Sequence, residues 1–171
     1  MKNIIYVGLA LLVLTSCQET KKIAFIDNGV VINDFQEKKD IETRFQERSN
    51  AFQKRRDSLV NAYQLELKAA QVKAQKMSPA NLKKLSHEIQ QKEQLLGQKI
   101  QLEQQAIQQE FQSQLDSVIV KVKAYVKDYG AANGYTYILG TSDAASTVLY
   151  GAEENDLTKV VLEALNANYK K

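Results

Sequence analysis

Apolar residues recur at helical spacing along the first long stretch of the chain. No Gly and no Pro interrupts residues 30–77, and the apolar positions follow steps of three, four or seven. They are Ile41, Phe45, Phe52, Leu59, Tyr63, Leu67, Ala70, Ala74 and Met77. The opposite faces carry Lys, Arg, Glu, Asp and Gln. Such a narrow stripe predicts a long helix that packs along a coiled-coil seam rather than against a broad core.

A second stripe follows after a short break at 78–81. Ser78 can cap a helix and Pro79 suits its first turn. The apolar positions after the break are Leu82, Leu85, Ile89, Leu96, Ile100, Ile107, Phe111, Leu115, Val118, Val122, Tyr125 and Tyr129. A connection this short makes helices over 30–77 and 82–129 antiparallel neighbours. Each would measure roughly 70 Å at 1.5 Å per residue, so the hairpin must project as an arm.

One glycine lies inside the second predicted helix. Gly97 costs about 1 kcal/mol relative to Ala at such a position. Polar residues near it, Lys92, Glu93 and Glu103, stand where the apolar stripe would continue. Two interpretations stay open: Gly97 is a hinge at which the arm bends, or it lets the two helices approach closely.

Short β-type segments flank the hairpin. Residues 22–27 are apolar with branched and aromatic side chains, and the run stops at Asp27-Asn28-Gly29, where Asp27 or Asn28 can cap the next helix. Beyond Gly130, the stretches 135–139 and 147–150 have the same character. A final amphipathic helix follows, with Asp156 as its expected N-cap and Leu157, Val160, Val161, Leu162, Leu165 and Tyr169 as its apolar positions.

The predicted fold is α+β and mostly α: a small β-sheet head, a long antiparallel helical-hairpin (coiled-coil) arm and a C-terminal helix. The head combines 22–29 with 130–171, and the arm spans 30–129. A three-stranded sheet with one covering helix is small for independent stability, so we expect the head to oligomerise. Candidate residues of the head core or of the subunit contact are Ile23, Phe25, Tyr137, Leu139, Val148 and Tyr150.

The N-terminal segment has the features of an export signal. Lys2 precedes an apolar run over 4–14, which is too short for a membrane span of about 20 residues. The run ends in Leu14-Thr15-Ser16-Cys17, which resembles the lipobox of bacterial lipoprotein precursors. The resemblance implies a signal peptide over 1–16 and a lipidated linker over 17–21, with the lipid on Cys17. The alternative is an ordinary secretory signal with an incidental cysteine.

Positive charge concentrates in the distal part of the predicted arm. The formal net charge of the chain is only +3, too low to indicate nucleic acid, and an export signal argues against that partner as well. Between residues 54 and 84, however, the basic side chains are Lys54, Arg55, Arg56, Lys68, Lys73, Lys76, Lys83 and Lys84, against Asp57 and Glu66. We expect them to contact acidic clients or anionic lipid head groups. The competing explanation is simple solubility of a long helix.

No sequence pattern indicates catalysis. The sole histidine, His87, lies among Gln and Lys on a predicted helix and is best interpreted as a solvated side chain. The chain has no phosphate-binding loop, zinc-ligand spacing or nucleophile elbow, and its one cysteine is assigned to lipid. We therefore expect no enzymatic activity, no cofactor and no metal.

These features together resemble the Skp/OmpH family of periplasmic chaperones. The resemblance covers residues 22–169 and is carried by the opening segment 22–31, the Gln-rich hairpin, and the closing segments 134–139, 148–150 and 156–162. It implies a homotrimer whose three arms surround a cavity and hold unfolded outer-membrane or envelope proteins without ATP. The alternative function is a lipid-anchored coiled-coil spacer or adaptor in the cell envelope.

The lipobox departs from the best-known members of that family, which are soluble in the periplasm. A lipid on Cys17 would instead hold this chain at a membrane. Gln18 stands where an Asp retains many lipoproteins at the inner membrane, so we expect the outer membrane.

Overall fold

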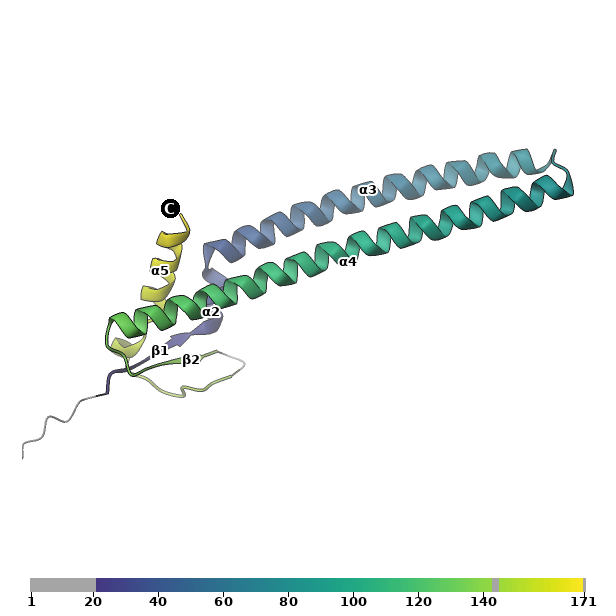
Figure 1. Cartoon of the computed structure of the whole chain (residues 1–171). Helices are drawn as coiled ribbons and strands as arrows, with labels where there is room; N and C mark the ends of the chain where they lie inside the picture. Colours follow the sequence, from purple (N-terminus) through teal and green to yellow (C-terminus); the bar gives the residue numbers. More distant parts are fainter. Residues whose placement is uncertain (1–20, 143–144, 171) are drawn as a thin grey trace, which may run out of the picture.

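The computed structural model describes residues 21–142 and 145–170, and Figure 1 shows a small head from which two long helices project side by side. The elements are β1 (Ile23–Asp27), α2 (Asn28–Asp34), α3 (Gln36–Ala74), α4 (Pro79–Ala132), β2 (Tyr137–Thr141), the 3-10 helix η1 (Glu153–Asn155) and α5 (Thr158–Tyr169). The predicted fold class, a small β-sheet head with an antiparallel helical arm and a C-terminal helix, is confirmed. The expected signal peptide and Cys17 lie outside the described residues.

The turn of the hairpin occupies residues 75–78. Ser78 has an extended backbone and precedes Pro79, the first residue of α4. A backbone N–H at this position has no acceptor within the helix, so proline costs no hydrogen bond there. The amide of Leu82 donates to the carbonyl of Ser78 over 2.9 Å. The Ser78 side chain makes no capping bond, so the turn depends on the proline rather than on the predicted serine cap.

The first predicted helix, over 30–77, is broken at Phe35. Asp27 caps α2 as expected, because its Oδ1 accepts from the amide of Val30 over 3.0 Å. Phe35 then takes an extended conformation (ψ 124°), and its buried ring meets Tyr169 of α5 edge-on at 5.9 Å. The amide of Gln36, the first residue of α3, donates to Asn166 Oδ1 over 2.8 Å. A side chain 130 residues away therefore caps the arm at its root.

The two strands form a parallel sheet in which Ile23 lies opposite Tyr137 and Asp27 opposite Thr141. The long hairpin acts as the crossover that a parallel pair requires. The predicted third strand over 147–150 is wrong, since that segment is irregular. The other edge of β1 instead meets the chain just before α5, where Leu157 N–H donates to the carbonyl of Phe25 over 2.9 Å.

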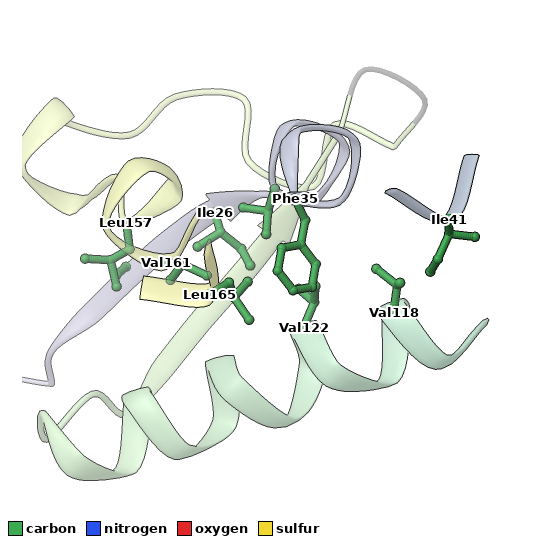
Figure 2. Close-up of a cluster of buried hydrophobic side chains, with 10 residues drawn as sticks. Ile26, Phe35, Ile41, Val118, Val122, Leu157, Val161 and Leu165 are labelled. Carbon is green, nitrogen blue, oxygen red and sulfur yellow. The ribbon is translucent and has the colours of Figure 1, made fainter. Parts of the chain in front are cut away.

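The hydrophobic core lies where α2, α4 and α5 pack against one face of the sheet (Figure 2). Its buried members are Ala24, Ile26, Val31, Phe35, Ile41, Val118, Val122, Leu157, Val161 and Leu165. Ile41 and Val118 carry this cluster past the break at Phe35 into the arm (Figure 2), where the partly buried Phe111 and Leu115 also pack against it. The head and the arm's root are thus one packed unit.

Substituting Asn166 by Ala tests the remote cap. We expect the free energy of unfolding to fall by about 1 kcal/mol, because the Gln36 amide loses its acceptor. Urea unfolding measures the loss, and hydrogen exchange at Gln36 reports the local opening. Asn168→Ala is the matched control, since Asn168 is exposed on the same helix. Equal effects of the two substitutions would contradict the cap.

Candidate functional site

The interior of the hairpin changes along its length. Near the root, Ile41, Phe52, Ile107 and Val118 are buried, and the rings of the intervening pair Phe45 and Phe111 stack at 4.1 Å. Beyond this zone the pattern stops: none of residues 53–106 is buried. The side chains between the distal helices are only half-buried, and they include Leu59, Tyr63, Leu67, Leu85, Ile89 and Leu96. We call residues 53–106 the distal arm.

Four ion pairs cross between α3 and α4. They join Glu37 to Lys121, Arg48 to Glu110, Arg55 to Glu103 and Glu66 to Lys92. Successive pairs are separated by eleven, seven and eleven residues on both helices, so every step along α3 is matched by an equal step back along α4. Exposed pairs of this kind contribute roughly 0–1 kcal/mol each, but a misaligned register would lose all four together. We call this set the ion-pair ladder.

The predicted basic residues occupy two separate parts of the arm. Lys68, Lys73, Lys76, Lys83 and Lys84 surround the turn, are exposed, and have no ion-pair partner within the described ranges. Lys54, Arg55 and Arg56 are also exposed but lie roughly 30 Å from the end of α3, at 1.5 Å per residue. Arg55 belongs to the ion-pair ladder and Arg56 pairs with Asp57. Of the predicted basic residues, these five lysines therefore carry the positive charge around the turn.

Exposed aliphatic side chains mark the distal arm. Leu65 and Val72 on α3, and Leu95 and Leu102 on α4, are 64–67% exposed. Each pair is separated by seven residues, which places its members on one side of their helix. The sequence does not reveal these four residues as a surface, because they lie off the stripes that hold the helices together. They are the most exposed of the large apolar side chains of the distal arm, ahead of Met77 and Leu82 near the turn.

A shallow groove of about 270 Å³ lies beside Leu95. It is lined mainly by Leu59, Ala62, Tyr63 and Leu96, with Glu66, Lys92 and Lys99 completing it. Desolvation raises the pKa of the Tyr63 hydroxyl above its ordinary value. The hydroxyl donates to the carbonyl of Ile89 over 3.3 Å.

Gly97 makes no close approach to the opposite helix. A Cβ built on it would meet no atom within 4 Å. Of the two interpretations left open by the sequence, close packing is therefore excluded by the geometry. A hinge at Gly97 stays a prediction.

Substituting Gly97 by Ala should stabilise the arm. We expect a gain of about 0.5–1 kcal/mol, because Ala loses less backbone entropy in a helix and meets no obstruction here. Gly134→Ala is the opposite control, because Gly134 has a positive φ of 69° that strains an Ala side chain. Urea unfolding compares the two, and spin-label distances across the arm report the narrower spread expected for a stiffer helix. A loss of stability in Gly97→Ala would contradict the open environment.

The outer face of the sheet is apolar and uncovered. Ile23, Tyr137 and Leu139 are exposed, and Phe25 is half-buried because Gly151 lies against its ring. Register pairs Ile23 with Tyr137 and Phe25 with Leu139, so the four side chains form one block. We call this block the outer sheet face.

The residues proposed for the head core are mostly not core residues of this chain. Alternation along β1 directs Ala24 and Ile26 inward and leaves Ile23 and Phe25 on the outer sheet face. Tyr150, in the loop after β2, is exposed, and Val148 is half-buried. The sequence misled here because both faces of β1 are apolar, and a strand of that kind does not reveal which face is inside. Their assignment to a subunit contact stays a prediction.

The break at Phe35 is supported by a polar cluster. Asp40 Oδ1 accepts from Gln36 Nε2 over 2.8 Å. This bond, and next the nearby Tyr169 hydroxyl, lower the pKa of the Asp40 carboxyl below its ordinary value. The cluster ties α5 to the first turn of α3 and so orients the arm on the head.

The described residues contain no group that indicates catalysis. His87 is exposed near the turn and contacts only Gln91, over 3.0 Å. Across 21–142 and 145–170, no three potential metal ligands of the His, Cys, Asp or Glu type come together. Within the same ranges, no helix is both long enough and apolar enough to span a membrane.

Comparison with known proteins gives one family and one fold. Residues 22–165 match the family described as Outer membrane protein (OmpH-like). The structure is similar to the crystal structure of a candidate OmpH-like outer membrane chaperone from Caulobacter crescentus CB15, with a TM-score of 0.73 and 18% identity. That likeness covers 86% of this chain and 85% of the other. No curated protein matches the sequence significantly.

Proposed function

This chain belongs to the OmpH-like family, and on that premise we propose that it is a non-enzymatic, ATP-independent periplasmic holdase. It would bind unfolded outer-membrane or other envelope proteins and prevent their aggregation. The structural likeness to an OmpH-like candidate chaperone supports a chaperone role in general. The proposal that it is a holdase rests on the construction of the arm.

The observation that carries the proposal is the open construction of the distal arm. An arm that served only as a rigid spacer would gain from a continuous buried seam, as coiled coils have. Here residues 53–106 include no buried side chain, while four large aliphatic side chains face outward. Exposed apolar groups on a thin, charged scaffold are suited to brief contacts with unfolded chains.

Weak contacts at many points suit a holdase better than one tight site. Each exposed Leu or Val could contribute up to roughly 1.5–3 kcal/mol if a client covered it fully, and partial cover gives less. Several arms acting on one client would raise the overall affinity through effective concentration. A client that folds into a membrane then leaves without any nucleotide, because folding removes its exposed apolar segments.

We propose that three copies assemble through the outer sheet face. The head offers a contiguous apolar block there, and the nearby loop side chains Leu149 and Tyr150 are 92% and 89% exposed. Apolar surface of this kind on a small head favours association. A three-fold arrangement would set the arms around a shared space.

Charges placed on the outer sheet face should prevent assembly. We expect the double substitution Tyr137→Glu and Leu139→Glu to convert the assembled protein to monomers, because paired carboxylates cannot be buried at an apolar contact. Sedimentation velocity measures the change. The matched control is Leu65→Glu with Leu102→Glu, which places the same charges on exposed apolar residues of the arm. Loss of assembly in both variants, or in neither, would refute the assigned contact.

We propose the outer membrane, by way of a lipid on Cys17, as the location. Six residues separate Cys17 from the start of β1 at Ile23, a reach of at most about 20 Å. A lipid there would hold the head close to the membrane surface. Fractionation tests the anchor, since Cys17→Ala protein should leave the membrane pellet; retention there would show that the lipid is not needed.

Aggregation of a β-barrel protein tests the central proposal. Urea-unfolded client is diluted into buffer with or without the full chain, and light scattering is followed over time. We expect suppression near one assembled chaperone per client, without ATP. A lipid-anchored spacer or adaptor predicts the same scattering with and without the chain, and that result would replace the holdase assignment.

A further inference from the structure

A groove in the head lies beside the end of α4, away from the distal arm, and borders the outer sheet face, with which it shares Tyr137. It has a volume of about 490 Å³ and separates the last turns of α4 from β2. Its apolar lining includes Ile26, Val122, Val126 and Ile138, and Tyr135 and Tyr137 add aromatic surface. The client-binding proposal does not use this groove.

The charged side chains that line the groove are all positive. Lys123 and Lys127 line it, and their spacing of four residues places both on one side of α4. No carboxylate is among the lining residues. Neither lysine has an ion pair or hydrogen-bond partner among the residues that the structure describes. On the arm, by contrast, Lys92 and Lys121 each face a glutamate.

A third cation stands close to the groove. Lys22 Nζ lies 4.0 Å from the centroid of the Tyr135 ring and donates to the carbonyl of Asn133 over 3.1 Å. The backbone of Lys22 also accepts from the amide of Thr136, a lining residue, over 2.8 Å. The described chain therefore begins beside the groove, at Lys21 and Lys22.

We propose that this groove binds an anionic phospholipid of the membrane surface. The phosphate would lie at Lys123 and Lys127, and the upper part of an acyl chain would cover Val126 and Ile138. Two unpaired cations beside an apolar floor match a ligand in which a compact negative charge adjoins hydrocarbon. The chain's own lipid would not explain the lysines, because acyl groups on a cysteine carry no negative charge.

Short-chain lipids below their micelle-forming concentration provide the probe. Dihexanoyl-phosphatidylglycerol and dihexanoyl-phosphatidylcholine are titrated into the full chain by calorimetry. We expect the anionic lipid to bind at least tenfold more tightly. In the double substitution Lys123→Gln and Lys127→Gln, its affinity should fall to that of the zwitterionic lipid. Circular dichroism checks that the variant keeps its helices.

A control variant that removes two lysines elsewhere tests whether the lipid preference depends on this groove or only on the overall positive charge of the chain. Lys159→Gln with Lys170→Gln removes the same charge from exposed positions in and just after α5, which does not line the groove, and should leave the preference intact. Equal affinity of the parent chain for the two lipids, an unchanged preference in the groove variant, or an equal loss in the α5 variant would each overturn the proposal.

Inorganic phosphate distinguishes a lipid from a free anion. We expect it to compete weakly, and Val126→Ser should weaken phosphatidylglycerol several-fold without affecting phosphate. If phosphate alone bound as tightly as the lipid and needed the same lysines, the groove would be an anion site and the phospholipid assignment would be wrong. None of these measurements depends on client binding, so failure of the holdase proposal would leave them interpretable.

Discussion

Replacing Val118 with Asp is expected to lower the free energy of unfolding by about 4 kcal/mol or more. Val118 is fully buried where the arm enters the head, beside Ile41 and Val122 (Figure 2). The substitution gives up roughly 1.5–3 kcal/mol of apolar burial and places a carboxylate where no partner exists, which costs several kcal/mol more. Domains are stable by only about 5–15 kcal/mol, so urea unfolding should show a greatly destabilised protein.

Val120→Asp is the internal control for that loss. Val120 lies two residues further along the same helix but is 65% exposed. An exposed substitution of this kind should change stability by about 0.5 kcal/mol or less. Similar losses in the two variants would mean that α4 does not present the described face to the head.

Removing the exposed aliphatic groups of the distal arm should abolish most client protection. The variant carries Gln at Leu65, Val72, Leu95 and Leu102. If each side chain gives up about 0.5 kcal/mol of contact with a client, the combined loss of about 2 kcal/mol weakens binding some thirtyfold. The amount of protein needed to suppress client aggregation by half measures the effect.

A stability measurement and a second variant at the same four positions show whether lost protection comes from unfolding or from the lost apolar surface. Because all four residues are exposed, the Gln variant should unfold at nearly the same urea concentration as the parent chain. Met at the four positions keeps apolar surface and should retain protection. Loss of protection in the Met variant, or full protection in the Gln variant, would rule out these side chains as the client contacts.

The hairpin could be predicted from sequence because its signals are local. The apolar stripes, the absence of Gly and Pro from residues 30–77, and Pro79 at the turn all concern neighbours in the chain. The break at Phe35 could not be predicted in this way. It is held by Asn166 and Tyr169, which pack onto it only after the C-terminal helix has docked.

The pairing of the second edge of β1 could not be predicted from local sequence either. Residues 147–150 have strand-forming side chains, yet the second edge of β1 is occupied by the chain at Asp156 instead. The N-cap of α5 is Leu157 rather than the predicted Asp156. The prediction still had a local basis, since Asp156 Oδ1 accepts from the amide of Thr158 over 2.8 Å. Of the candidate surfaces, the basic residues were visible as a charge excess. The exposed leucines required the structure, because only packing shows which apolar residues have no neighbour.

The equal steps of the ion-pair ladder constrain how the arm can change length. Glu37 and Arg55, like Arg48 and Glu66, are eighteen residues apart, which is five helical turns. Deleting residues 56–66 together with 92–102 would shorten the arm by about 16 Å. The three ion pairs nearer the head would still face each other. A deletion in one helix alone would set like charges side by side. Insertions and deletions in related chains should therefore come in matched pairs, one on each side of the turn.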